Sequence, residues 1–280
     1  MSKVFLNGEI IEAADAKLSI FDSGFLYGDG LFETMRATDG KVFRIDDHID
    51  RMFASAEKLS IKIGGDKKFV RDAVYNTLDA NELKFARIRL TVSNGPMGSD
   101  VEQAPTVLVT ATDFQAYPAE FYTDGVRVVL SDFRQNSADP LCGHKSTCYS
   151  SRLVALKDAQ KKQATESLWF TTDNKLAEGC VSSVFVVKDG KLFTPSLDTP
   201  VLDGIARKTI LDLAGDEGIE AIEQDLYIDD LLEADEVFIT NVIMLILPVT
   251  TVEAHAVGDG KPGEITKKLL DKFQQFVTKK

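Results

Sequence analysis

The segment at 86–93 alternates strictly between apolar and polar residues. The apolar side ends in Val92, and the polar side includes Arg87 and Arg89. A period of two is the pattern of a strand that is buried on one face only. The segment therefore predicts a half-buried strand whose polar face carries two arginines, and any fold for this chain must include a sheet.

Other segments predict strands and helices that do not alternate regularly along the chain. Strands are predicted at 4–8, 105–112, 126–131, 168–172, 184–188 and 236–240, and helices at 46–59, at 152–162, after residue 204 and at 264–277. Asp46 is the predicted N-cap of the first helix. The apolar stripes of the first and last helices are Ile49, Met52, Phe53, Ala56 and Leu59, and Ile265, Leu269, Phe273 and Phe276. This order predicts an α+β fold rather than a doubly wound parallel sheet.

The length of 280 residues allows one large domain or two modest ones. The stretch at 113–124 interrupts the periodic pattern with Pro118 and mixed polar residues. Such a break is typical of a linker between two lobes. We therefore predict a small N-terminal α/β domain at 1–115, a linker at 116–124 and a larger C-terminal domain at 125–280.

Charge and composition disfavour several classes of function. Lys and Arg total 32 against 44 Asp and Glu, so the formal net charge is −12, which disfavours binding to nucleic acid or to an anionic membrane. No apolar run approaches the roughly 20 residues of a membrane span, and the start of the chain lacks a signal-peptide pattern. Three cysteines without a C-x-x-C arrangement, and only three histidines, disfavour a disulfide scaffold or a metal site. We expect a cytoplasmic protein without a metal.

Three motifs that would indicate other enzymes fail on inspection. Gly28-Asp29-Gly30 is followed by Glu33 instead of the third glycine of the dinucleotide fingerprint. The stretch at 143–146 lacks the glycines of a P-loop, and Ser150-Ser151 lacks the flanking glycines of a nucleophile elbow. The sequence gives no support for NTPase or hydrolase chemistry.

A different set of residues carries more chemistry. Lys145 precedes Tyr149 by four residues, just before a predicted helix, and Arg51 lies one helical turn after His48. A helix after Gly204 would offer free N–H groups to a phosphate. Each feature alone has an ordinary explanation, because a loop lysine is usually solvated, Arg51 fits a helix surface and Tyr149 fits a core.

Together these segments resemble the fold-type IV pyridoxal-phosphate enzymes, which include branched-chain aminotransferases, D-amino acid aminotransferases and aminodeoxychorismate lyase. The resemblance covers nearly the whole chain. It depends on the segments 25–34, 48–52, Lys145 with Tyr149, 178–180, 204–207, 238–241 and Pro248-Val249. It implies a two-lobed enzyme whose larger C-terminal domain is β-barrel-like and carries the cofactor lysine.

The resemblance also implies roles for individual residues toward pyridoxal 5'-phosphate. Lys145 would form the Schiff base with the cofactor aldehyde and move the substrate proton. Glu178 would contact the pyridine nitrogen and keep the ring protonated. Tyr149 would hold the ring 3'-oxygen, and Arg51 would pair with the phosphate as a fork. The remaining cofactor-binding residues would be Gly204, Ile205, Ala206, Thr240 and Asn241.

The substrate pocket implied by the resemblance is of the branched-chain type. Its residues would be Tyr27, Phe32, Arg36, Arg89 and Met97. The loop at 94–100 lacks the Arg-x-His pair of D-amino acid aminotransferases and the arginine of the lyase, whereas Thr240-Asn241 is closer to the lyase. Ser183 and Val242 also depart from the usual family residues, which are asparagine and a small or hydroxyl residue.

These features favour an aminotransferase that moves the amino group of a small, mainly aliphatic amino acid to 2-oxoglutarate. A D-amino acid aminotransferase with a different carboxylate contact comes second, and aminodeoxychorismate lyase third. A non-catalytic binding protein on the same scaffold is disfavoured because both Lys145 and Glu178 are present. The resemblance implies a homodimer in which a loop of each subunit closes the pocket of the other.

Overall fold

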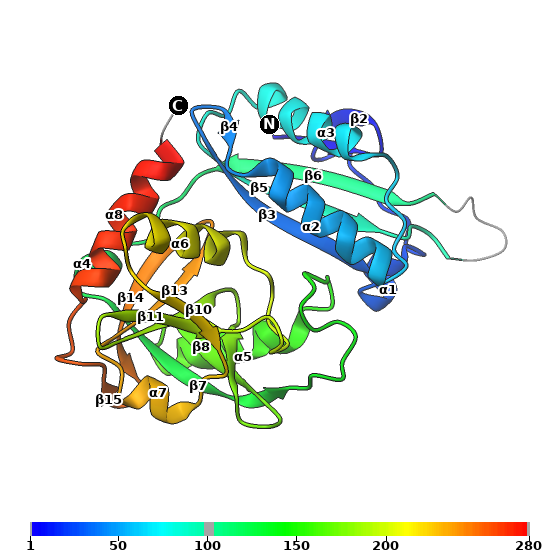
Figure 1. Ribbon diagram of the computed structural model, residues 1–280. Coiled ribbons are helices and arrows are strands. Elements are labelled where there is room, and N and C mark those ends of the chain that lie inside the picture. The colour runs from blue at the N-terminus through cyan, green and yellow to red at the C-terminus, as the bar shows by residue number, and fades with distance from the viewer. Residues whose placement is uncertain (1, 98–103, 279–280) are drawn as a thin grey trace. The chain divides into compact units, whose positions relative to one another are not determined.

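The computed structural model describes residues 2–97 and 104–278, and the chain divides into two units (Figure 1). Unit 1 comprises Met1–Gln115 and His144–Tyr149, and unit 2 comprises Ala116–Gly143 and Ser150–Lys280. Strands are numerous and many of their pairings are antiparallel, so the α+β prediction is confirmed.

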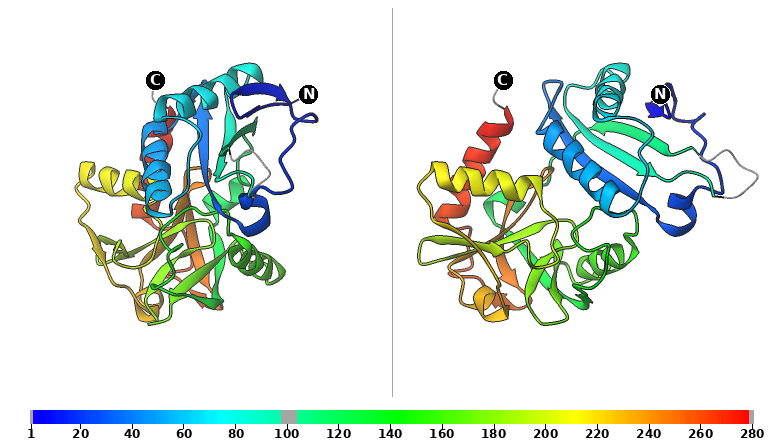
Figure 2. Two further views of the ribbon diagram at one scale, coloured as in Figure 1. Left: turned by 90° about the vertical axis from the view of Figure 1, so that its right-hand side faces the viewer. Right: turned by 45° about the vertical axis from the view of Figure 1, so that its right-hand side comes forward.

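Unit 1 contains an antiparallel sheet with two long helices on one face. Its elements are β1 (Lys3–Leu6), β2 (Glu9–Glu12), α1 (Ser23–Tyr27), β3 (Gly30–Thr38), β4 (Lys41–Val42), α2 (Ile45–Lys58), α3 (Lys67–Ala80), β5 (Ala86–Ser93) and β6 (Thr106–Asp113). The strand order is β2-β1-β6-β5-β3-β4. Helix α2 contacts β3 and helix α3 contacts β1 and β6, and Figure 2 shows both helices against this sheet.

The core of unit 1 forms between these helices and the sheet. The alternation at 86–93 places Ile88, Leu90 and Val92 of β5 in the core, where all three are fully buried. The stripe predicted for the first helix also faces this core: Ile49, Met52 and Ala56 are buried, and Phe53 and Leu59 pack against it. The opposite face of the sheet consequently carries the polar side of β5, including its arginines.

Unit 2 contains a larger mixed sheet that curls. Its elements are α4 (Ala119–Thr123), β7 (Val126–Gln135), α5 (Ser150–Lys161), β8 (Glu166–Thr171), β9 (Leu176–Gly179), β10 (Ser183–Lys188), β11 (Lys191–Pro195), α6 (Ile205–Asp216), β12 (Ala221–Gln224), α7 (Ile228–Leu232), β13 (Glu236–Asn241), β14 (Leu245–Val252), β15 (His255–Ala256) and α8 (Glu264–Thr278). The strand order is β12-β11-β10-β13-β14-β7-β8-β9, with β15 paired to β14. Strand β9 is the last strand in this order. It also contacts β10 and β11, which are the third and second strands of the order, so the sheet curls back on itself.

Two helix details differ from the sequence predictions. Helix α2 begins at Ile45, and its N-cap is Arg44 in a left-handed conformation rather than Asp46, because the buried Ile45 extends the helix by one residue. In α8 the buried stripe includes Leu269 and Phe273 but not Phe276, which is 41% exposed. The helical period instead buries Thr266, Leu270 and Val277 on the same face.

The division of the chain also corrects the predicted domain boundaries. The predicted linker at 116–124 contains α4 and belongs to unit 2, where the Tyr122 hydroxyl donates to the Met244 carbonyl at 3.1 Å. The segment His144–Tyr149 belongs to unit 1, although we assigned the lysine to the C-terminal domain. Backbone pairing with β3 is the reason, because β4 reaches only the far end of that strand and leaves this edge open.

Candidate active site

Lys145 lies in a short extended segment that pairs with the first residues of β3. The Phe32 N–H donates to the Lys145 carbonyl at 2.9 Å, and the Thr147 N–H donates to the Gly30 carbonyl at 2.9 Å. Residue 30 must be glycine here, because the Cβ atom of any other residue would lie 2.5 Å from the carbonyl oxygen of Val92. The strand therefore fixes the backbone of Lys145, whose half-buried side chain carries its amine 4.7 Å from the centre of the Phe32 ring.

Three predicted site residues contact the buried Phe32 ring. Besides Lys145, the guanidinium of Arg89 lies 3.4 Å from the ring centre, and the Tyr149 ring packs edge-to-face at 5.4 Å between centroids. Burial, and then the charge of Arg87, lowers the pKa of Arg89 to about 10. Arg89 still remains a cation at neutral pH, so the ring is flanked by two positive groups.

Arg51 is engaged by a buried carboxylate that the sequence analysis did not assign. Its Nε and Nη2 donate to Glu33 Oε1 and Oε2 at 2.8 and 2.5 Å, and His48 Nδ1 lies 2.7 Å from Glu33 Oε2. Burial opposes ionisation of Glu33, but Arg51 and His48 together lower its pKa to about 2. Burial lowers the pKa of His48. Two of the three Arg51 nitrogens thus bind Glu33, and its contact with a phosphate stays a prediction.

The remaining predicted pocket residues are more dispersed. Tyr27 and Met97 are largely exposed, and no described contact joins either of them to Phe32. Arg36 packs over the Phe114 ring at 4.1 Å and lies across from Arg87 in the register of β3 and β5. Residues 98–100 of the loop that lacks the carboxylate-binding arginine lie outside the described residues.

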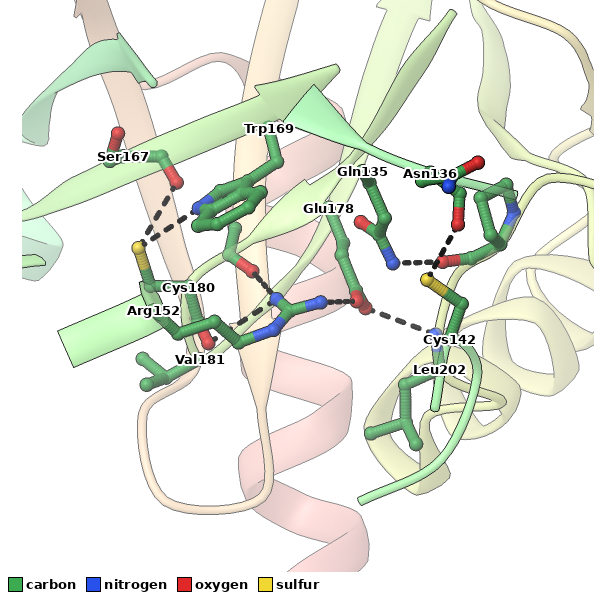
Figure 3. Close-up of polar contacts among 12 residues, drawn as sticks. Gln135, Asn136, Cys142, Arg152, Ser167, Trp169, Glu178, Cys180, Val181 and Leu202 are labelled. Carbon is green, nitrogen blue, oxygen red and sulfur yellow. Dashed lines mark hydrogen bonds and ion pairs between the residues drawn. The ribbon is translucent and has the colours of Figure 1, made fainter. Parts of the chain in front are cut away.

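Glu178 is the penultimate residue of β9 in unit 2, and both of its carboxylate oxygens accept hydrogen bonds. Arg152 Nη2 donates to Oε1 at 2.5 Å, and the Leu202 N–H donates to Oε2 at 3.1 Å (Figure 3). The side chain is 8% exposed, so this ion pair is largely shielded from water. An ionised carboxylate with about four acceptor positions can accept a further donor beside these two.

The N-terminus of α6 forms a cradle that suits a phosphate group. Gly204 is its N-cap, and no side chain caps the first N–H groups of this helix. A methyl group on Gly204 would lie 2.9 Å from Ser183 Oγ. Ser183 pairs with Thr240 across β10 and β13, so two hydroxyl-bearing residues are neighbours in the sheet there. Free N–H groups at a helix start, with the positive end of its dipole, favour an anion.

Thr240 and Asn241 already make local contacts. The Thr240 hydroxyl donates to the Leu245 carbonyl at 2.5 Å, so donation to a phosphate would require release of this bond. Asn241 Oδ1 accepts the N–H groups of Ile243 and Met244 at 2.9 Å, which builds the turn after β13. Val242, which follows Asn241, is buried in this turn.

Glu33 and Arg152 are the two charged residues at these positions that sequence reasoning missed. Glu33 stood within the segment that carries the family resemblance, and its signal was a carboxylate directly after the apolar pair Leu31-Phe32. Arg152 follows Lys145 by seven residues and Tyr149 by three, on the first turn of α5. Its spacing from Tyr149 was visible, but its partner is 26 residues away in sequence.

Two general absences hold for the part of the chain that the structure describes. Among residues 2–97 and 104–278, no helix is both long enough and apolar enough to cross a membrane. Within the same residues, no group of three or more His, Cys, Asp and Glu side chains is arranged to hold a metal ion.

Comparison with known proteins places this arrangement in a family. The sequence is 38% identical to the "Putative branched-chain-amino-acid aminotransferase" of Methanocaldococcus jannaschii, 31% identical to a D-alanine aminotransferase of Listeria monocytogenes and 34% identical to the aminodeoxychorismate lyase of Bacillus subtilis. These matches cover 99%, 99% and 95% of this chain and 97%, 96% and 92% of those proteins.

The solved structure of Escherichia coli branched-chain amino acid aminotransferase matches with a TM-score of 0.94 and 29% identity, over 99% of this chain and 95% of that one. The family described as Amino-transferase class IV matches residues 30–252. The resemblance inferred from the sequence is therefore confirmed, and the chain is an enzyme of the class IV aminotransferase family.

Proposed function

We propose that this enzyme uses pyridoxal 5'-phosphate to move the amino group of a small, mainly aliphatic amino acid to a 2-oxo acid such as 2-oxoglutarate. The observation that carries the proposal is the Lys145 amine, which backbone pairing with β3 holds against the Phe32 ring. The membership in the class IV aminotransferase family supports the same reading. When bound, the cofactor supplies an aldehyde that condenses with amines and a ring that accepts electrons.

Several described residues fit the chemical demands of this group. Lys145 Nζ would attach the aldehyde carbon and later move a proton at the substrate Cα. Glu178 would accept a hydrogen bond from the protonated ring nitrogen, and Tyr149 would donate to the ring oxygen. The N-terminus of α6 would hold the phosphate, because it offers uncapped N–H groups next to Ser183. Gly204 leaves space there because it has no side chain.

The face of the unit 1 sheet that carries Phe32 and the arginines supports a substrate pair with different side chains. Phe32 offers an aromatic wall to an aliphatic side chain. Arg89 lies on this ring, and the next register row brings Arg36 and Arg87 opposite each other. Several guanidiniums on one face of a sheet favour a carboxylate. We therefore assign the second carboxylate of an acidic acceptor to this arginine-bearing face.

An exposed apolar surface supports the proposed homodimer. Ile20, Phe25 and Tyr27 are 69%, 74% and 69% exposed, and Leu18 and Phe21 beside them are also exposed. Clustered large apolar side chains of this kind mark protein interfaces. We propose that this surface, residues 18–27, contacts a second copy of the chain. Light scattering with size-exclusion chromatography tests this: Phe25→Asp should shift the mass toward the monomer, and an unchanged mass would contradict it.

One experiment tests the cofactor assignment. The purified protein reconstituted with pyridoxal phosphate should absorb at about 410–420 nm, and borohydride reduction followed by peptide mapping should label Lys145. The Lys145→Ala variant should remain folded and lose both the label and turnover. A labelled lysine elsewhere, or none, would overturn the proposal.

A substrate panel tests the amino acid class. Branched-chain L-amino acids should bleach the cofactor band, and 2-oxoglutarate should restore it. A response to D-alanine alone would favour a D-amino acid aminotransferase, in line with the relative from Listeria. Conversion of aminodeoxychorismate without an acceptor would favour the lyase, in line with the relative from Bacillus.

A further inference from the structure

The guanidinium of Arg152 contacts the Glu178 carboxylate, a backbone carbonyl and an aromatic ring. Its Nη2 donates to Glu178 Oε1 at 2.5 Å, while its Nη1 donates to the Gly179 carbonyl at 2.8 Å and lies 3.5 Å from the Cys180 carbonyl (Figure 3). The centre of the Trp169 ring lies 5.4 Å from its guanidinium carbon. A planar guanidinium held by a carbonyl, a carboxylate and a ring face has a fixed orientation.

The groups behind Arg152 are neutral. The Trp169 indole N–H donates to Cys180 Sγ at 3.3 Å, and the Trp169 ring stacks on Phe133 at 5.7 Å. Burial raises the pKa of Cys180 to about 12, so the sulfur remains a thiol at neutral pH. The Glu178 carboxylate is thus the anion in direct contact with Arg152 among the described ion pairs.

The second oxygen of Glu178 connects the carboxylate to the loop that enters α6. The Leu202 N–H donates to Oε2, and Leu202 lies two residues before Gly204. The Pro200 carbonyl of the same loop accepts a hydrogen bond from the Gln135 side chain. The carboxylate is therefore fixed on one side by a cation and on the other by a backbone that leads to the proposed phosphate cradle.

We propose that Arg152 is a positioning residue that holds the Glu178 carboxylate in the orientation needed to accept a hydrogen bond from the cofactor ring nitrogen. This inference rests on the proposed function. Arg152 holds Oε1 and the Leu202 N–H holds Oε2, so the direction of the remaining acceptor positions of the carboxylate depends on Arg152. Removal of the guanidinium frees the carboxylate to turn, which would weaken a hydrogen bond from the ring nitrogen.

The test compares two probes that differ only at the ring nitrogen. One is pyridoxal phosphate, and the other is its deaza analogue, in which C–H replaces the ring nitrogen. Their dissociation constants are measured on cofactor-free protein by fluorescence. Wild type should prefer pyridoxal phosphate, and Arg152→Met should reduce this preference by about tenfold, the scale of one charge-assisted hydrogen bond. Arg152→Lys keeps the charge and should retain part of it.

Arg134 provides a matched control in the same unit. It donates to the Ser131 carbonyl at 2.6 Å and packs 5.9 Å from the Phe170 ring, in an arrangement without a carboxylate. Arg134→Met should leave the preference for the ring nitrogen unchanged. In steady-state assays, Arg152→Met should lower kcat with little change in KM for the amino acid.

The outcomes separate this inference from the proposed function. Failure of wild type to bind pyridoxal phosphate at Lys145 would overturn the proposed function. Wild-type binding with equal affinity for both probes, or an Arg152→Met variant that weakens both probes equally, would overturn the role of Arg152. If Arg152→Met does not fold, Arg152→Lys with full wild-type preference and rate would also count against the proposal, because lysine cannot reproduce the fork.

Discussion

Two buried carboxylates, one in each unit, are stabilised in opposite ways. Glu33 in unit 1 is paired with Arg51 and His48, and its pKa falls to about 2 despite burial. Glu166 in unit 2 accepts only neutral donors, and burial raises its pKa. Those donors are the N–H groups of Ser167, Cys180 and Val181 and the hydroxyl of Ser182, at 2.9 to 3.1 Å.

The difference shows what an ionised carboxylate needs inside a protein. Four neutral hydrogen bonds to Glu166 do not offset the loss of hydration, whereas one guanidinium and one imidazole at Glu33 do. The same contrast gives the two residues different uses. Glu33 fixes the side chains of α2 against β3, and Glu166 organises the backbone turn at 180–182 directly after Glu178.

The largest expected effect is the loss of the Glu33 charge. Glu33→Gln leaves the Arg51 guanidinium buried against a neutral amide, and breaking a buried pair in this way costs about 3–5 kcal/mol. Chemical denaturation followed by circular dichroism should show this loss. Trp169 is the single tryptophan and lies in unit 2, so its fluorescence reports on the other unit. A loss below about 1 kcal/mol would contradict the buried ion pair.

The pH dependence of this stabilisation follows from the sign of the shift. The pKa of Glu33 is depressed from 4.5 to about 2, so its contribution is complete above pH 4.5 and disappears as the pH falls toward 2. The full effect is about 3 kcal/mol. The stability difference between wild type and Glu33→Gln should therefore shrink between pH 5 and pH 3.

His48 also destabilises the folded state in acid, because burial lowers its pKa from 6.5 and the unfolded chain binds the proton first. The Glu33 comparison is therefore repeated in a His48→Gln background, in which this histidine no longer titrates and Arg51 remains to lower the pKa of Glu33. A difference between the two proteins that stays constant from pH 5 to pH 3 would show that Glu33 is not held ionised.

Sequence reasoning found the elements near these carboxylates more readily than the carboxylates. The clean alternation of β5 and the apolar stripe of α2 predicted both elements, because each has one buried face. Strand β3 was missed: its residues 30–33 are all buried, so the alternation of its burial is confined to its second half. Glu33 lies where the two parts meet, and its partners come from a helix 15 and 18 residues later.

In the candidate site, too, some residues could be predicted from the sequence and their partners could not. Lys145, Tyr149 and Glu178 could be named from their spacing and from the resemblance to the family. Their local partners could not, because Arg152 meets Glu178 only through the packing of α5 against β8 and the β8–β9 hairpin. The attachment of 144–149 to β3 was likewise invisible, since a six-residue loop gives no periodic signal of backbone pairing.

A smaller effect is expected for the neutral environment of Glu166. Glu166→Gln resembles the protonated side chain but puts an amide donor opposite N–H groups, which should cost about 1–3 kcal/mol. The pH dependence should be the reverse of that for Glu33. Because the folded pKa is raised, wild type loses stability as pH rises from 4.5 through that pKa, so the cost of Glu166→Gln should diminish. A cost that grows over this range would contradict the raised pKa.

The smallest expected effect comes from a single neutral donor. Ser182→Ala removes the hydroxyl that donates to Glu166 Oε2 at 2.9 Å, while the backbone bond from the Gly179 N–H to the Ser182 carbonyl remains. Loss of one such bond costs about 1 kcal/mol, measured by Trp169 fluorescence, against an exposed control, Ser137→Ala. A donor stabilises the ionised form of a carboxylate more than the neutral form, so the cost should not be smaller at pH 8 than at pH 5. A smaller cost at pH 8, or a cost no larger than that of Ser137→Ala, would contradict donation from the Ser182 hydroxyl to Glu166.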